Sequence, residues 1–324
     1  MQVSFAQQSP TLSNHQLNSC PKVHRMPPHG GYGMNSGAID ALDLGWRLAA
    51  VTKGYGGPLL LRAYNLERRR MMIRALERSL RHLLEHVKLS EIYAHNAPLL
   101  EANTPAGENI RLQIRQFIDA SGPDTMDHGI ELDLRYGDSS PVIYHDGSPE
   151  HKWDVKRYIP STRPGCRAPH VFLRDGVTST YDLFGVGWTL VHFVSDNGNG
   201  NDNNNHTNTT NEKASEIFTT VAKDMAFPLK RVLLHNEDHA FHVWEERDLV
   251  LVRPDTHVAW RGYAPALTCA DVEEILSVVA GRVAFPGFVP STDVGSRMFE
   301  ELIAGFTDMH QGSSSSSTIL GEDV

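Results

Sequence analysis

The sequence is short of cysteine, of positive charge and of long apolar runs. Its three cysteines, Cys20, Cys166 and Cys269, lie far apart and form no CxxC pair, so we expect free thiols in a reducing, cytoplasmic compartment. The formal net charge of -9 argues against nucleic acid as a partner, because phosphate binding requires a basic face. No apolar run approaches the roughly 18 residues that a membrane span needs, so no membrane contact is predicted.

The beginning of the chain has no features of a secretory signal, because it carries neither a basic start nor an apolar core. Residues 1–22 are polar and lack periodicity, so we expect a disordered lead. The Asn-rich segment 196–211 predicts a disordered insertion. The Ser-rich run within residues 291–324 predicts a tail that is disordered at its end.

Two stretches of different character lie between these segments. The chain has 324 residues, which is enough for two domains, and hydrophobic residues make up 40% of them, which is enough for a core. Residues 23–128 combine a glycine-rich turn with helical periodicity, whereas residues 129–290 alternate strand and helix patterns. The expected fold class is therefore mixed α/β, with a helical first unit followed by an α/β sandwich.

The first unit is expected to contain three helices. One begins with Asn35 or Ser36 as its cap. Its apolar face consists of Ile39, Leu42, Trp46 and Ala49. A second runs from about Leu59 to Leu89 and is basic, with six arginines between Arg68 and Arg81 that predict a solvated face or a salt-bridge face between subunits. Its apolar stripe consists of Leu76, Leu80, Leu83 and Val87. A third is expected near residues 108–119.

The second unit has both strand and helix patterns. The segments that read as strands are 129–136, 167–176, 187–195 and a hairpin at 248–260. Helical periodicity marks residues 213–225 and 269–283. This order predicts a sheet covered by helices.

The segment His24–Ser36 is the one most suited to a ligand. Pro27 and Pro28 precede four glycines that fall between Gly30 and Gly37. Glycine lets backbone N–H groups come close to a ligand, and the helix that follows directs its unpaired N–H groups and positive dipole end there. Such a junction suits a polar acceptor such as the N1–C2=O edge of a flavin. A plain turn between packed elements has the same composition and stays open.

Residues 23–70, with HRMPPHGGYGMNSGAIDALDLGW at their start, resemble the last conserved block of the FAD-dependent aromatic hydroxylases. These are single-component flavoprotein monooxygenases of the phenol hydroxylase type. The resemblance implies FAD as cofactor, NAD(P)H as reductant and a small phenolic or other aromatic substrate; it assigns no catalytic residue. The implied cofactor contacts are Pro27, Pro28, Gly33, Met34 and Asn35. The last three would meet the flavin pyrimidine edge through their backbone, and the prolines would line the ring.

Segments 164–193 and 249–262 resemble the thioredoxin-like C-terminal domain of the same family. A true thioredoxin carries CxxC just after the strand at 187–195, where this chain has DNGNG, so dithiol chemistry is not expected. Cys166 is interpreted as a spectator thiol. In the family this domain serves packing and subunit contact, which implies a homo-oligomer.

The chain departs from the family at its start. The family's Gly-Asp pair belongs four positions before His24, where Cys20 to Val23 stand instead, and no GxGxxG opens a βαβ unit. We therefore expect the N-terminal FAD-binding part to be missing, through truncation or because a complementary FAD-binding chain supplies it. Stand-alone activity is then doubtful, and the helix after the turn is expected to expose an apolar face.

Two hypotheses on function remain. In the first, the chain belongs to an FAD- and NAD(P)H-dependent aromatic hydroxylase; in the second, it is a non-catalytic module for partner binding or dimerisation. His29 is either a substrate contact or a surface histidine, and Trp46 is expected in the core. A histidine-rich stretch has metal-like spacing, at His235, Asp238, His239 and His242. Chance clusters are common among 17 histidines, so no metal site is predicted.

Overall fold

The structure, a computed structural model, describes residues 26–122, 126–137, 140–194, 205–264 and 267–288, with the backbone alone for 205–212. The predicted disordered lead and tail, and residues 196–204 of the predicted insertion, lie outside these residues. The rest of that insertion differs from the prediction, because helix α5 (Asn205–Asp224) already begins within it. Once the buried part of a helix has formed, each further residue adds one hydrogen bond and no new helix nucleus has to form.

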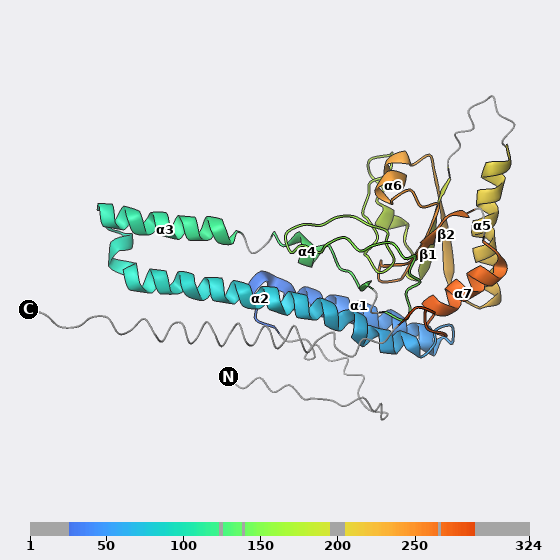
Figure 1. The fold of residues 1–324 in the computed structure, drawn as a ribbon, viewed down its shortest axis with the longest axis horizontal. Helices are drawn as coiled ribbons and strands as arrows, with labels where there is room; N and C mark the ends of the chain where they lie inside the picture. The colour runs from blue at the N-terminus through green and yellow to red at the C-terminus, as the bar shows by residue number, and fades with distance from the viewer. Residues whose placement is uncertain (1–25, 123–125, 138–139, 195–204, 265–266, 289–324) are drawn as a thin grey trace, which may run out of the picture.

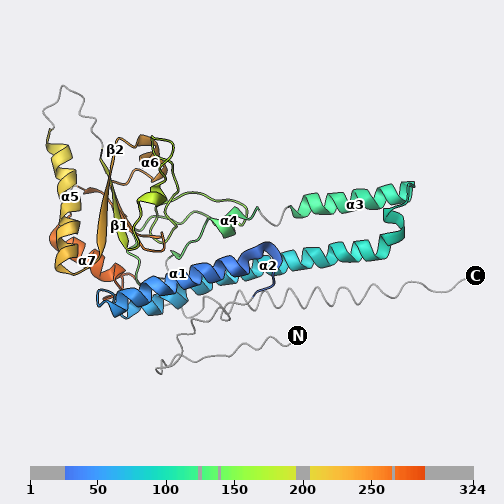
Figure 2. The same ribbon diagram turned by 180° about the vertical axis from the view of Figure 1, so that it is seen from behind.

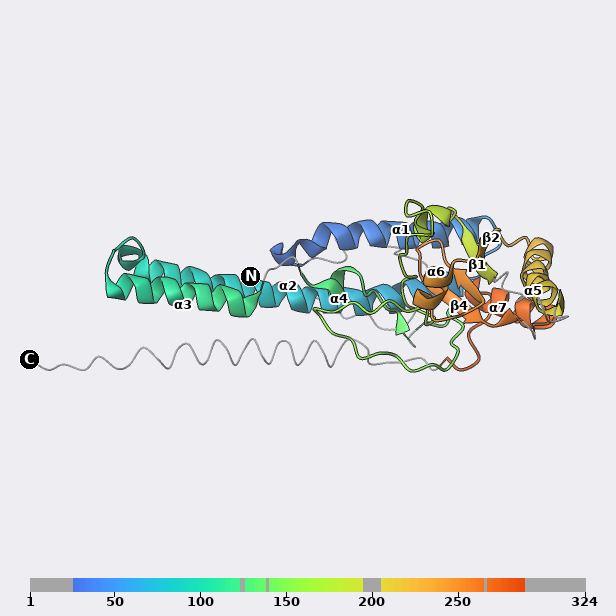
Figure 3. The same cartoon turned by 90° about the horizontal axis from the view of Figure 1, so that it is seen from above.

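Two long antiparallel helices form one side of the molecule (Figure 1). They are α1 (Tyr32–Thr52) and α2 (Leu59–Leu100). Helix α3 (Pro105–Ser121) folds back along the far half of α2, away from the sheet (Figure 3). The turn between α1 and α2 packs on the end of α7 (Cys269–Val279), where a Cβ on Gly57 would lie 2.2 Å from the Gly281 carbonyl oxygen. Only glycine permits this approach.

Both long helices extend further than predicted. Helix α1 begins at Tyr32, not after Asn35 or Ser36, because Gly31 at its N-cap takes a left-handed φ of 70° that ends the preceding turn. Helix α2 passes its predicted end at Leu89, because α3 packs along the extension. Most of the chain between residue 90 and residue 121 is therefore helix.

The apolar faces predicted for these helices are only partly buried. Leu42 is 52% exposed and Val87 is 44% exposed, although both were assigned to apolar faces. Trp46 is buried as expected. The buried positions include several charged side chains, namely Asp43, Arg47, Glu67, Arg68 and Arg78. Pairing between opposite charges, which periodicity does not reveal, makes their burial possible.

The second unit is built on a four-stranded sheet. Its strands are, in spatial order, β2 (Leu229–His235), β1 (Trp188–Val194), β3 (Leu249–Val252) and β4 (Val258–Gly262). Strands β1 and β2 are parallel and joined by α5, whereas β3 and β4 form an antiparallel hairpin followed by α7 (Cys269–Val279). Helices α5 and α7 cover the same face (Figure 2), and the short α6 (Asp238–Val243) lies on the other. This is the expected thioredoxin-like α/β arrangement.

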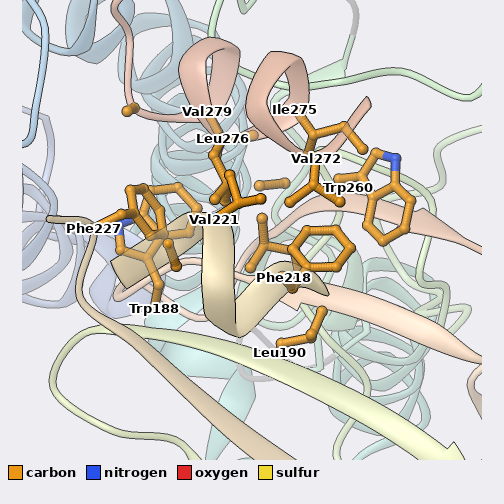
Figure 4. Packing of buried hydrophobic residues seen from close by; sticks show 14 of the residues in the cluster. Trp188, Leu190, Phe218, Val221, Phe227, Trp260, Val272, Ile275, Leu276 and Val279 are labelled. Carbon is orange, nitrogen blue, oxygen red and sulfur yellow. The ribbon is translucent and has the colours of Figure 1, made fainter. Parts of the chain in front are cut away.

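The larger core lies between the sheet and helices α5 and α7 (Figure 4). Trp188 from β1, Phe218 from α5 and Leu276 from α7 are fully buried there. Trp46 of α1 joins the same core and meets Trp188 edge-on, with ring centroids 5.8 Å apart. Because each large apolar side chain contributes about 1.5–3 kcal/mol on burial, this shared core fixes α1 on the sheet domain.

Two predicted strands are absent from the described residues. Segment 129–136 begins in the short helix α4 (His128–Glu131), and segment 167–176 makes only isolated bridges. The reason is local: Arg135 donates to Asp133 at 2.6 Å, and Gly129 packs so closely on a neighbouring loop that a Cβ would lie 1.9 Å from the Asp154 carbonyl. The backbone of segment 129–136 bonds to loops instead, since the Gly129 N–H donates to the Val155 carbonyl at 3.0 Å and the Tyr136 N–H to the Gly165 carbonyl at 2.9 Å. A 3₁₀ turn, η3 (Thr180–Leu183), closes this region before β1.

Candidate functional site

The glycine-rich turn leads directly into α1. Pro27 and Pro28 precede a short 3₁₀ turn, η1 (His29–Gly31). Gly30 has a φ of 78°, and a Cβ there would lie 2.3 Å from the Tyr32 ring. This position therefore requires glycine for both its backbone angle and its space.

The backbone at the start of α1 offers free donors. The Gly31 N–H donates to the Pro28 carbonyl at 3.1 Å. Helical geometry leaves the N–H groups of Gly33 and Met34 without a carbonyl partner in their own helix. Gly33 is exposed and Met34 is 83% exposed, so a ligand can reach these groups. They are also at the positive end of the helix dipole.

The predicted contact residues lie together around this turn. A Cβ on Gly33 would meet the Met26 side chain at 3.7 Å, which is an ordinary van der Waals contact, so this side of the turn is not tightly packed. The Asn35 side-chain amide donates to the Gly31 carbonyl at 3.1 Å and stiffens the junction. The arrangement leaves the N–H groups of Gly33 and Met34 on an open surface that suits a polar acceptor.

Helix α2 holds the turn from below. The Ser79 hydroxyl lies 2.7 Å from the Pro27 carbonyl oxygen and 2.9 Å from that of His29. The Tyr32 hydroxyl donates to Asp127 at 2.6 Å. Asp127 is fully buried and also accepts from Arg78 at 2.5 Å.

Two further cationic or polar groups surround Asp127. His82 Nε2 lies 3.0 Å from its carboxylate, and Lys156 Nζ forms an ion pair at 2.7 Å. Burial alone would raise the pKa of Asp127, but hydrogen bonds from Arg78, Lys156, Tyr32 and His82 outweigh it and hold the pKa well below its ordinary value. Asp127 is therefore charged at any physiological pH.

A second buried network ties the middle of α1 to the sheet domain. Arg253, at the end of β3, donates to both carboxylate oxygens of Glu67 on α2 at 3.0 Å. It also reaches Asp43 on α1 at 3.3 Å and Asp255 at 3.0 Å. Arg47 bonds to Asp43 at 3.0 Å and to Glu67. We call these five residues the charge cluster.

The charge cluster contains one more carboxyl than guanidinium. Burial is the largest effect on Asp43, and together with the nearby Asp255 it raises the pKa of Asp43 to about 7 against the attraction of Arg47 and Arg253. Asp43 is therefore the carboxyl of the charge cluster that takes up a proton most readily, and it is protonated below neutral pH.

One face of α1 is open to solvent and apolar. Leu42 is 52% exposed, and the neighbouring small residues Ala38, Ala41 and Gly45 are exposed as well. No charged side chain interrupts this face between Met34 and Gly45. The expectation that the helix after the turn exposes an apolar face is confirmed.

A cavity of about 450 Å³ lies on α2 beside the turn. It is lined by His29, Leu83, His86, Val87, Ser90, Glu91, Ala94 and His95. The His29 and His86 rings meet edge-on with centroids 5.1 Å apart. His29 therefore points along α2 at the edge of the turn.

The other singled-out residues lie away from the turn. Cys166 is buried, and burial raises the pKa of its thiol to about 12, which leaves it unreactive. Cys20 lies outside the described residues. Of the histidine-rich stretch, His242 lies 3.3 Å from Glu246, and the described residues contain no group of three metal-ligating side chains. None of the helices in the described ranges is long and apolar enough to cross a membrane.

Two known protein families match the segments that contain the glycine turn and the sheet. Residues 22–79 match the family model described as FAD binding domain, and residues 161–283 match that of the aromatic-ring hydroxylase C-terminal domain. Together the two matches cover more than half of the chain. The chain belongs to the FAD-dependent aromatic hydroxylases. The glycine turn lies in the first match, and the sheet domain lies in the second.

Named hydroxylases and monooxygenases are similar to this chain over most of its length. The FAD-dependent monooxygenase apdD of Emericella nidulans is 37% identical over 242 residues, which are 74% of this chain and 36% of the relative. The solved structure of the rebeccamycin biosynthetic enzyme RebC with reduced flavin matches with a TM-score of 0.60 at 33% identity, covering 80% of this chain and 43% of that one. Aklavinone-11 hydroxylase, solved with FAD and aklavinone, matches with a TM-score of 0.54 at 26% identity, over 79% of this chain and 41% of that one. The chain spans less than half the length of these three proteins.

Sequence reasoning missed the residues that support the turn. Tyr32 stands in the motif, but nothing in its neighbourhood indicates a partner 95 positions away at Asp127. Arg253 and Glu67 are likewise 186 positions apart. The one usable signal was the surplus of charged residues on otherwise apolar helix faces.

Proposed function

We propose that this chain forms the flavin-ring side of an FAD-dependent aromatic hydroxylase. The observation that carries the proposal is the open N-terminus of α1, with accessible N–H groups at Gly33 and Met34 above a turn that only glycine can make. This site lies within the segment that matches the FAD binding domain family.

The chemistry of the donors suits a flavin. The N–H groups of Gly33 and Met34 would bind the carbonyl at the pyrimidine edge, with the helix dipole favouring negative charge there. Asn35 would hold the junction, and Pro27 and Pro28 would form a rigid wall along the ring. Bound FAD, reduced by NAD(P)H, would supply the activation of O2 for hydroxylation of a small aromatic substrate. The residues of this chain would orient the ring and exclude water from one side of it.

The nucleotide half of FAD has no equivalent site in this sequence. No GxGxxG precedes a strand-turn-helix unit, so the phosphate and ribose contacts of such a unit are absent from these 324 residues. Each charge-assisted contact is worth about 1.5–3 kcal/mol, so the loss of several weakens binding by many orders of magnitude. We therefore propose that tight FAD binding needs a nucleotide-binding lobe from a longer polypeptide or a second chain.

A titration with FAD tests the proposal. Flavin fluorescence should change on addition of the chain, and Gly33→Val should weaken binding about tenfold or more because its side chain enters the proposed site. Gly37→Val is the matched control, since it stands one turn later in the same helix and its Cβ meets nothing within 4 Å. Equal effects of the two substitutions, or tight FAD binding that ignores Gly33, would contradict the assignment of the site.

The alternative is a module that binds a partner or a second copy without catalysis. The apolar face of α1 around Leu42 favours it, because exposed faces of this kind usually mark contacts. Light scattering after size-exclusion chromatography separates the two. A stable oligomer that Leu42→Glu dissociates, together with no flavin response at any concentration, would support the alternative.

A further inference from the structure

We propose that Tyr32 and Asp127 are positioning residues that lock the glycine turn in its open shape. Tyr32 is the first residue of α1, and its side chain turns back below Gly30. Asp127 comes from the segment after α3, far from the turn in sequence. That the turn binds a flavin rests on the proposed function. The lock, by which we mean the Tyr32–Asp127 contact that fixes the turn, does not depend on any ligand.

The Tyr32 side chain packs directly against the glycine turn. Its ring occupies the space that a Cβ on Gly30 would need, so ring and turn cannot shift independently. Its hydroxyl donates to Asp127 at 2.6 Å and lies 3.2 Å from His82. A hydrogen bond to a carboxylate is about twice as strong as a neutral one, so the ring has one preferred position.

Asp127 is itself held rigidly. Its two oxygens are shared among the donors of Tyr32, Arg78, His82 and Lys156, which come from α1, from α2 and from the loop beyond α4. The carboxylate is fully buried, so water does not compete for these contacts. A group fixed from three directions defines the position of the tyrosine that reaches it.

The remainder of α1 is fixed independently. Trp46 lies in the shared core and Asp43 lies in the charge cluster, both more than two turns from Tyr32. Loss of the tyrosine hydroxyl should therefore loosen the first turn alone, as a local opening and not as global unfolding. This distinguishes positioning from a general contribution to stability.

Hydrogen exchange measured on the full chain without flavin tests the lock. In Tyr32→Phe, the ring below Gly30 is kept and only the hydroxyl is lost. We expect exchange of the amides of Asn35, Ser36 and Gly37, which close the first helical hydrogen bonds, to become about tenfold faster or more. The amides of α7 should be unchanged. Unchanged exchange at all three positions, or an equal increase in α7, would overturn the proposal.

Two companion variants sharpen the result. Tyr64→Phe removes a half-buried hydroxyl from α2 that makes no hydrogen bond found among the described residues, and it should leave exchange at the turn unaltered. Asp127→Asn keeps the shape but not the charge, and should speed exchange at the turn at least as much as Tyr32→Phe. If Tyr64→Phe acts like Tyr32→Phe, the effect is not specific and the proposal fails.

A second readout links the lock to the ligand. FMN titration of the same variants should show weaker binding and an altered flavin absorption band for Tyr32→Phe and wild-type behaviour for Tyr64→Phe. Should the wild-type chain show no response to FMN, the proposed function fails, whereas the exchange result still decides the lock. Should Tyr32→Phe speed exchange but leave the flavin band and affinity unchanged, the positioning role is refuted.

Discussion

Replacing Arg253 with methionine removes the centre of the charge cluster that ties α1 and α2 to the sheet domain. Arg253 is 2% exposed and bonds to both oxygens of Glu67, to Asp43 and to Asp255. Methionine fills much of the same volume but leaves three buried carboxyls with Arg47 as the single cation of the cluster. Breaking a buried ion pair in this way costs about 3–5 kcal/mol. A domain of ordinary stability has only about 5–15 kcal/mol in total, so the variant should be marginal.

Urea unfolding followed by circular dichroism measures this loss. Arg253→Lys should lose less, because lysine keeps the charge but not the forked pair of bonds to Glu67. Arg174→Met is the control: Arg174 is exposed, its guanidinium bonds to the Asn236 carbonyl at 3.3 Å, and its loss should cost less than about 0.5 kcal/mol. A loss below about 1 kcal/mol for Arg253→Met would refute the view that the cluster joins the two units.

Two other predictions follow from the titration of buried groups. The pKa of Asp43 is raised from 3.8 to about 7, so the folded state binds its proton more tightly than the unfolded state does. This contribution to stability is fully present below about pH 4 and is lost as the pH rises to about 7; urea unfolding at several pH values should show the decline in wild type and a flatter profile in Asp43→Asn. Cys269 is exposed and Cys166 is buried with its pKa raised to about 12, so a thiol reagent at pH 8 should label Cys269 and reach Cys166 only after denaturation. Rapid labelling of Cys166 in the folded chain would show that its surroundings are open.

The sequence was most informative where function and backbone geometry coincide. The glycines after Pro27 and Pro28 predicted a tight turn that leads into a helix, and the structure has this turn at Gly30 and Gly31, directly before α1. That the turn holds a ligand stays a prediction. The hairpin of β3 and β4 and the helices α5 and α7 were also predicted, because their apolar patterns match a two-sided core. Trp46 was correctly placed in that core.

Errors arose where long-range polar contacts replace hydrophobic periodicity. Segment 129–136 alternates like a strand, yet Asp133 and Arg135 are buried as a pair, and within the described residues the segment makes only an isolated bridge from Arg135 to Cys166. The arginines of α2 were assigned to a solvated face or to a salt-bridge face between subunits, but Arg68 bonds to Asp40 at 2.6 Å and Arg78 bonds to Asp127 within the same chain. Such pairs join positions far apart in the chain, so no local pattern identifies the partner.

The most direct test of the central claim is a nuclear magnetic resonance titration of the ¹⁵N-labelled chain with FMN. FMN carries the flavin ring without the adenosine half, so the result does not depend on a nucleotide-binding lobe. Our account predicts shift changes concentrated in the backbone N–H signals of Tyr32, Gly33, Met34 and Asn35, and their loss in Gly33→Val. Shift changes centred on any other element, or none at the turn when FMN is saturating, would contradict it.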